Sequence, residues 1–159
     1  MKFIIEQIAL CPPDPAKAIE FLELIGLGEW AHDHVVADGS VFGSDQQRNE
    51  ADLAFNYEAT SSKALELEVL HYTNGMNWMQ TRPSSVSHLG MHCTAGELLQ
   101  WRAKFADLGI LVAQEVNTAS HTNPVIAGKR LYTYVIFSTR HILGTDLKFI
   151  VRHVLDGQP

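Results

Sequence analysis

The sequence repeats itself at a spacing of about 80 residues, and this repeat constrains the fold more than any other feature. The first copy opens with an apolar stretch at 6–11 and the second opens in the same way at 87–93, each followed by an amphipathic helix pattern. Gln7 is matched by His88, 81 positions later. Two copies of one strand-rich unit predict a pseudo-twofold fold with a site between the halves.

The two copies also end alike. Residues 65–71 contain alternating apolar and polar side chains, and residues 147–153, 82 positions later, carry a similar pattern. Polar residues at matching positions of the two copies are therefore the first candidates for chemistry.

The first copy predicts one strand, one helix and three further strands. Residues 3–11 alternate and are rich in Ile and Phe, as is typical of a strand. Asp14 is a good N-cap with Pro15 at the first helical position, and the helix ends near Gly26. Further strands are expected at 29–37, 51–59 and 63–72, with a polar loop at 43–50 and a linker at 73–86.

The second copy predicts the same order. After the strand at 87–93, Thr94 and Glu97 form a capping-box pattern at the start of a helix that runs to about Leu108. Its inward residues should be Leu98, Trp101, Phe105 and Leu108, and strands are expected near 110–117, 130–138 and 146–154. We therefore predict one α+β domain spanning 1–159, built from two βαβββ modules at about 1–82 and 86–156. Their curved mixed sheets should surround a cleft, with the helices outside.

Two tandem βαβββ units resemble the glyoxalase/bleomycin-resistance/extradiol-dioxygenase group, the vicinal oxygen chelate superfamily. The resemblance implies metal ligands on the first and last strands of each unit. Gln7, in the sequence Glu-Gln-Ile-Ala-Leu, and His88, in Ser-His-Leu-Gly-Met, match the two first-strand positions. Glu68 matches the carboxylate of the last strand of the first unit. Glu66 lies two residues away on the same strand face, so either glutamate fits that position.

The fourth ligand position departs from the pattern. The resemblance implies a Glu four residues after a Gly, but the residue four positions after Gly144 is Lys148. Asp146 lies on the same strand face and is an alternative ligand. An ion pair of Lys148 with Glu66 or Glu68 is a further alternative that needs no metal.

The resemblance implies chemistry in which two adjacent substrate oxygens chelate a divalent metal that acts as a Lewis acid. Zn, Fe, Mn or Ni would fit an amide oxygen, a carboxylate and an imidazole. In this interpretation Gln7, Glu68 and His88 hold the metal, and Glu68 and Lys148 take part in catalysis.

Three further residues are candidates for contact with the substrate. His92 lies four residues after His88 on the same strand and faces the same way. Tyr132 and Tyr134 share one face of a predicted strand, as the wall of a ligand cavity would.

Composition limits the kinds of partner and the compartment that we expect for this protein. A net charge of −6 with scattered basic residues argues against nucleic acid, and no apolar run approaches the length of a membrane span. The first residues lack a signal-peptide pattern, so we expect a cytoplasmic protein. Cys11 and Cys93 lack metal-type spacing and are interpreted as small buried thiols.

Two functions remain open from the sequence. One is a metal-dependent lyase, isomerase or dioxygenase acting on a small oxygen-bearing substrate. The other is a metal-free protein that binds or sequesters a small ligand, as implied by the bleomycin-resistance members of the group. A homodimer is also expected, because open sheets need covered edges.

Overall fold

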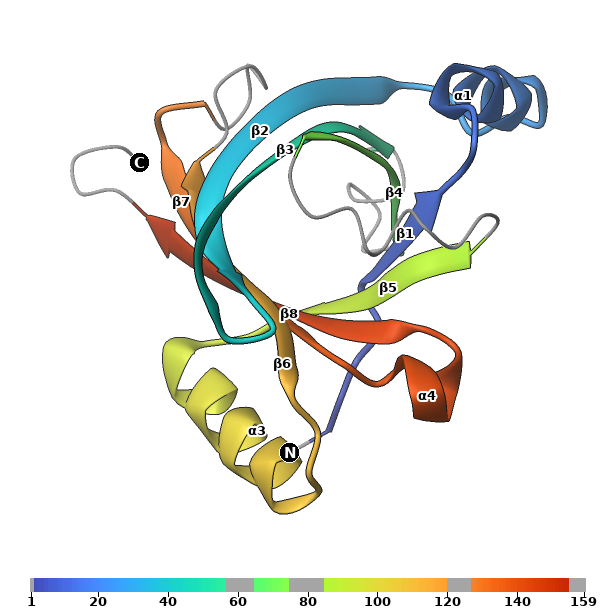
Figure 1. The fold of residues 1–159 in the computed structure, drawn as a ribbon. Coiled ribbons are helices and arrows are strands. Elements are labelled where there is room, and N and C mark those ends of the chain that lie inside the picture. The colour runs from blue at the N-terminus through green and yellow to red at the C-terminus, as the bar shows by residue number, and fades with distance from the viewer. Residues whose placement is uncertain (1, 57–64, 75–84, 120–126, 155–159) are drawn as a thin grey trace.

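The computed structural model of the chain describes residues 2–56, 65–74, 85–119 and 127–154. Its strands form one closed barrel in the order β1-β4-β3-β2-β6-β7-β8-β5, with helices on the outside (Figure 1). The predicted α+β sheet that curves around an interior is therefore present. The finer boundary between modules, expected near 82–86, falls largely outside the described residues and stays a prediction.

The first half contributes four strands and one helix. They are β1 (Gln7–Cys11), α1 (Pro15–Leu24), β2 (Trp30–Val41), β3 (Ser44–Asn56) and β4 (Glu66–Asn74). β1 pairs with β4 in parallel, while β4 with β3 and β3 with β2 are antiparallel. The sheet is mixed because α1 separates β1 from the hairpin strands that follow it.

The second half repeats this arrangement. It contains β5 (Ser85–His92), α3 (Ala95–Asp107), β6 (Val112–Ala119), β7 (Arg130–Phe137), α4 (Arg140–Leu143) and β8 (Asp146–Val154). β5 pairs with β8 in parallel, and the other pairs within this half are antiparallel. The order βαβββ predicted for each copy is found in both halves, with α4 as an addition between β7 and β8.

Two junctions join the halves and close the barrel. β1 lies antiparallel to β5 along its whole length, whereas β2 meets β6 only from Gly39 to Val41. The second junction needs a glycine. A Cβ on Gly39 would lie 2.2 Å from the carbonyl oxygen of Glu115 and 2.3 Å from a methyl of Val116.

The main apolar core lies between α3 and the barrel wall of the second half. Leu98, Trp101 and Phe105 of α3 are buried as predicted and pack on aromatic and aliphatic residues of β7 and β8. The prediction that Leu108 also faces inward is wrong, because Leu108 is the C-cap of α3 and is 65% exposed. As the C-cap, Leu108 has left the helical conformation (φ −90°, ψ 1°), so its side chain does not continue the apolar face of α3.

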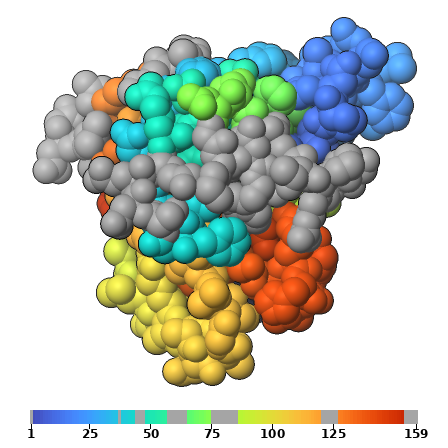
Figure 2. Space-filling view, viewed as in Figure 1, coloured from blue at the N-terminus to red at the C-terminus, as the bar shows by residue number. Residues whose placement is uncertain are grey.

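The helix of the first half is less well covered. α1 begins as predicted, with Asp14 accepting a hydrogen bond from the backbone N–H of Lys17, but none of its residues is buried. Phe21 and Leu24 are 60% and 82% exposed. In the space-filling view α1, in blue, projects at the end of the molecule away from α3, in yellow (Figure 2).

Two local predictions were wrong. Residues 43–50, expected as a loop, form the turn and first half of β3, because their backbones continue the β2–β3 ladder despite polar side chains. The short helix α4 was not predicted. It closes at Gly144, whose φ of 76° is a left-handed conformation that glycine adopts easily.

The barrel closes through β2 and β6, but their pairing covers only Gly39 to Val41 of β2. The homodimer, expected because sheet edges need cover, therefore stays a prediction. Among the described residues, no helix is both long and apolar enough to cross a membrane.

Candidate metal and ligand site

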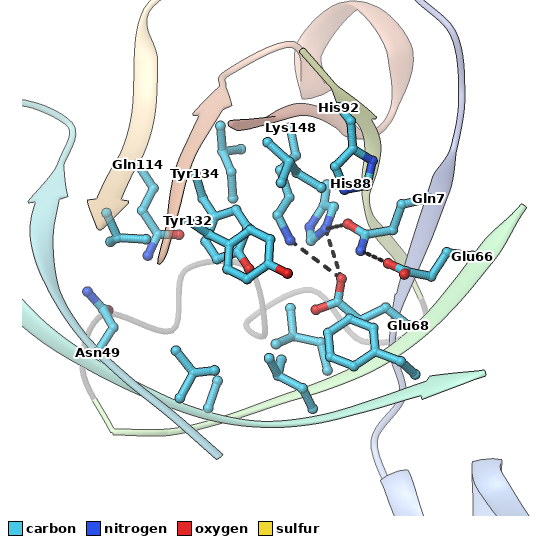
Figure 3. Close-up of a pocket in the computed structure, with 18 of the residues that line it drawn as sticks. Gln7, Asn49, Glu66, Glu68, His88, His92, Gln114, Tyr132, Tyr134 and Lys148 are labelled. Atoms are coloured by element: carbon cyan, nitrogen blue, oxygen red, sulfur yellow. Dashed lines mark hydrogen bonds and ion pairs between the residues drawn. The ribbon is translucent and has the colours of Figure 1, made fainter. Parts of the chain in front are cut away.

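The interior of the barrel holds a cavity of about 190 Å³. Polar side chains gather at one wall of it, where β1, β4, β5 and β8 meet (Figure 3). Aromatic and aliphatic side chains line the rest, together with Asn49 and Gln114 on the far side. The polar wall therefore lies where the two halves join, as the repeat predicts.

Gln7, Glu68 and His88 converge at this wall. The Nε2 atom of His88 lies 3.2 Å from Oε1 of Gln7 and 3.4 Å from Oε2 of Glu68. Their exposed fractions are 3%, 1% and 1% in the order of the chain. The strand register explains the meeting: Ala9 of β1 stands opposite both Glu68 on β4 and His88 on β5, one strand on each side.

Glu66 has a different place from Glu68. Its Oε1 accepts a hydrogen bond from Nε2 of Gln7 (Figure 3). Burial raises the pKa of Glu66, while the hydrogen bond from Gln7 acts against this rise. With the carboxylate oxygen as acceptor, the amide nitrogen of Gln7 is turned toward Glu66 and its amide oxygen toward His88. Glu66 therefore orients Gln7, and Glu68 is the glutamate whose carboxylate reaches His88.

Gly90 makes room for Gln7. It stands directly opposite Gln7 in the β1–β5 pair, and a Cβ there would lie 2.9 Å from Oε1 and 3.0 Å from Cβ of Gln7.

We expect Gly90→Ala to displace the Gln7 amide and to lower divalent-metal affinity about 10- to 100-fold, the usual effect of disturbing a ligand's support. Titration calorimetry measures this. Gly28→Ala, where a Cβ meets no atom within 4 Å, is the control, and equal affinity in both variants would contradict the role of Gly90.

Burial and nearby charges set the protonation states of the two titratable donors. Burial, together with the charge of Lys148, lowers the pKa of His88 to about 4, so its imidazole is neutral at pH 7. Burial alone raises the pKa of Glu68, but Lys148 and His88 outweigh it and lower the pKa to about 2. A neutral imidazole and an ionised carboxylate are the forms that bind metals.

Ser87 supports the imidazole from behind. Its hydroxyl lies 3.3 Å from Nδ1 of His88. A hydroxyl can donate or accept, so it fits either tautomer, including the one that leaves Nε2 free to bind a metal.

The separations between these donor atoms fit a divalent ion. Two donors that bind one ion at about 2.1 Å lie roughly 3.0–3.4 Å apart in octahedral or tetrahedral geometry. The separations from His88 to Gln7 and to Glu68 fall in this range. In addition, Oε2 of Glu68 is buried and makes no hydrogen bond of good geometry. Among the described residues no three His, Cys, Asp or Glu side chains form a group that could hold a metal, so a site here would need the Gln7 amide oxygen as its third donor.

Lys148 faces the cavity, as predicted, and lies beside the donors. Its Nζ is 3.5 Å from Oε2 of Glu68 and 4.5 Å from the centre of the Tyr134 ring. The strand pairs also show that it is the counterpart of Glu68: Ala9 pairs with Glu68, and Gly90, 81 positions after Ala9, pairs with Lys148. The ion pair predicted between Lys148 and one of the two glutamates is thus formed with Glu68.

Asp146, considered as an alternative ligand, lies elsewhere. Its carboxylate is fully buried and accepts hydrogen bonds from Arg140. The backbone N–H of Arg140 donates at 3.0 Å, its side-chain Nε donates at 3.1 Å, and a terminal nitrogen of the guanidinium lies at 3.0 Å. Arg140 also donates to the carbonyl of Ser87 at 2.7 Å. Asp146 does not line the cavity, and its carboxylate is held by Arg140 of α4 instead.

The three residues expected to contact substrate all line the cavity. Tyr132 and Tyr134 lie nearly parallel, with ring centres 5.7 Å apart and planes 11° apart. Burial raises the pKa of Tyr134, so its hydroxyl stays protonated at neutral pH. His92 lies nearer the surface, where its ring is 3.4 Å from the carboxylate of Glu6.

Sequence reasoning missed Arg130 and Arg152 in the cavity lining, Gly90 opposite Gln7, and the part of Glu66 as the partner of Gln7. The two arginines carried a signal, since each has the same strand parity as a predicted cavity residue, Tyr132 or Lys148. Glu66 and Gly90 carried none, because their roles depend on which residue of β1 stands opposite them.

Comparison with solved structures supports the fold. No family model matches the sequence, and no curated protein matches it. Among solved structures, the chain is similar to a triple mutant of 4-hydroxymandelate synthase from Streptomyces coelicolor, with a TM-score of 0.58 and 9% identity. The match covers 98% of this chain and 49% of the other, so the chain spans about half the length of that structure. At this low identity the likeness shows a shared fold and no more.

Proposed function

We propose that this chain is a divalent-metal-dependent enzyme of the vicinal oxygen chelate kind. It would act as a lyase, isomerase or dioxygenase on a small substrate with two adjacent oxygens. The convergence of Gln7, Glu68 and His88 at donor separations of 3.2 and 3.4 Å carries the proposal. The fold shared with 4-hydroxymandelate synthase adds support for the kind of protein and none for the substrate.

In this proposal the three side chains hold the ion, and Zn, Fe, Mn or Ni fits the donor set. A bound ion would supply a Lewis acid for two adjacent substrate oxygens. Glu66 keeps the Gln7 oxygen turned toward the site, and Ser87 steadies the His88 ring. The barrel wall keeps water away from the donors, because all three are almost completely buried.

Lys148 would stabilise negative charge that develops on the substrate. Its ammonium lies in the cavity beside Glu68, held over the ring of Tyr134. A fixed charge in a site with little water stabilises an oxyanion more than it would in solution. Because Lys148 stands where the resemblance implies a fourth ligand, the site would keep more than one coordination position open for substrate.

The second candidate is a metal-free ligand-binding protein. It is favoured by the contact between Lys148 and Glu68, because the ammonium already compensates the buried carboxylate. In this case the cavity and its stacked tyrosines would hold the ligand.

Metal uptake by the parent protein and by Lys148→Glu separates the two candidates. The protein is stripped with a chelator and then titrated with Zn, Mn, Ni or anaerobic Fe(II), with metal content measured after gel filtration. If the proposal holds, the parent takes up one equivalent, and Lys148→Glu binds it at least about tenfold more tightly, since an anionic donor replaces a repelling cation. Lys148→Met, which removes the charge without adding a ligand, should fall between them. A parent that takes up none of the four metals would exclude the enzyme and leave the binding protein.

A further inference from the structure

Two arginines line the same cavity beyond the polar wall. Arg130 lies on β7 and Arg152 on β8, and both belong to the inward rows of their strands. In the β7–β8 pair, Arg152 stands directly opposite Tyr132, and Arg130 is the next inward residue of β7 beyond Tyr132. The two arginines therefore occupy neighbouring inward positions on β7 and β8, at one end of the cavity.

These arginines differ from the others that the structure describes. Arg48, Arg102 and Arg140 each form an ion pair with a carboxylate. Arg130 and Arg152 form no ion pair with any described residue. The positive charge of Arg152 acts to lower the pKa of Glu66, whose carboxylate also accepts a hydrogen bond from the Gln7 amide. Two positive charges at one end of a cavity thus remain available to an anion.

The remaining lining residues connect the arginines at one end of the cavity to the polar wall at the other end. Along β8 the inward residues run from Arg152 through Ile150 to Lys148, and the opposite residues of β7 run from Tyr132 through Tyr134 to Ile136. Arg152 and Lys148 are four residues apart, which is about 13 Å of strand. The stacked tyrosine rings lie along this path, between the arginines and the wall that holds Glu68 and His88.

We propose that the cavity takes a small organic carboxylate with a flat, unsaturated body. Its carboxylate would lie at Arg130 and Arg152, where guanidinium groups can bind both oxygens, and its body would lie along Tyr132 and Tyr134. The opposite end of the ligand then points toward Gln7, Glu68 and His88. A cavity of about 190 Å³ is below the roughly 300 Å³ of sites for drug-sized ligands, so the body is about one ring in size. The position of the reacting end rests on the proposed function, whereas the carboxylate site does not.

Binding of benzoate and cinnamate to chelator-treated protein tests the carboxylate site alone. Titration calorimetry compares each acid with its uncharged amide, benzamide or cinnamamide. We expect the acids to bind more tightly than the amides, and Arg130→Gln and Arg152→Gln each to weaken the acids about tenfold or more. The amides should bind equally to the parent and to both variants. Arg48→Gln, which breaks an exposed pair with Glu50, should change nothing.

Three outcomes would overturn the proposal. One is unchanged affinity for the acids in both arginine variants. The second is weakening by Lys148→Gln but by neither arginine variant, which would put the anion at the inner end. The third is no saturable binding of either acid up to about 10 mM, above the range of even weak specific ligands. Because no metal is present in these titrations, a failed metal-uptake experiment leaves this result unaffected.

Discussion

His88→Ala should abolish the uptake of a divalent ion. His88 is the only imidazole at the polar wall whose Nε2 lies within 3.4 Å of both other donors, among the residues that the structure describes. Without it, only the amide oxygen of Gln7 and the carboxylate of Glu68 remain as donors. Lys148 already forms an ion pair with that carboxylate and would then compete with the metal for it. We expect the affinity to fall more than about 100-fold, beyond the effect of disturbing a ligand's supporting residue. Metal content after gel filtration and titration calorimetry both measure it.

His34→Ala is the matched control. His34 is an exposed histidine whose Nδ1 lies 2.8 Å from the carboxylate of Asp52, outside the cavity. Metal uptake by this variant should equal that of the parent. Equal uptake by His88→Ala and His34→Ala would show that the ion, if bound, is held elsewhere.

The pH dependence of binding gives a second check on the same residues. The pKa of His88 is lowered to about 4 and that of Glu68 to about 2, so both are already in the metal-binding form above pH 5. Protons should therefore compete little with the metal between pH 5 and 8, and affinity should fall only as the pH drops toward the pKa of His88. A tenfold loss for each unit from pH 7 to 6 would indicate an ordinary exposed histidine as the ligand instead.

Asp146→Ala should destabilise the protein by about 3–5 kcal/mol, the usual cost of leaving one partner of a buried ion pair uncompensated. Asp146 is fully buried, the side chain of Arg140 is 8% exposed, and three nitrogens of Arg140 lie within 3.1 Å of the carboxylate. Arg140 also ties α4 to the carbonyl of Ser87 in β5. The loss should therefore loosen the strand end that carries His88. Urea unfolding followed by circular dichroism gives the change in free energy.

Two variants complete this measurement. Asp146→Asn keeps the shape and part of the hydrogen bonding, so it should be destabilised less than Asp146→Ala. Asp52→Ala removes an exposed pair with His34 and should change stability little, because solvent screens such pairs. If Asp146→Ala unfolds at the same urea concentration as Asp52→Ala, the buried pair contributes nothing to stability.

Much of the fold followed from the sequence, because it depends on local pattern and on duplication. The cap at Asp14 and the capping box of Thr94 and Glu97 have a short-range cause, and both are found. The strand predicted at 3–11 is found over Gln7–Cys11 only. The polar start of β3 could not be predicted in the same way. Its backbone is held by pairing with β2, and composition says nothing about a partner strand.

For the candidate site, too, the sequence predicted what depends on duplication but not what depends on strand register. The repeat indicated that Gln7 and His88 occupy equivalent places, and the structure brings them to 3.2 Å. The choice between Glu66 and Glu68 depended on register. Aligning 65–71 with 147–153 matches Lys148 to Glu66, but the strand pairs match it to Glu68. A shift of two residues keeps every side chain on its face, so the alternation of polar and apolar residues cannot detect it.

The pairing of β1 with strands far along the chain has a consequence for how the protein is made. Gln7 meets Glu66 across 59 residues and His88 across 81. At roughly 5–20 residues per second, about 4–16 s of translation separate Gln7 from His88. Contacts at such sequence distances also form slowly, because long loops must close before the contacts stabilise anything. The three side chains therefore stay apart on the growing chain and come together only when the barrel closes, so the proposed site would take up a metal only in the finished protein.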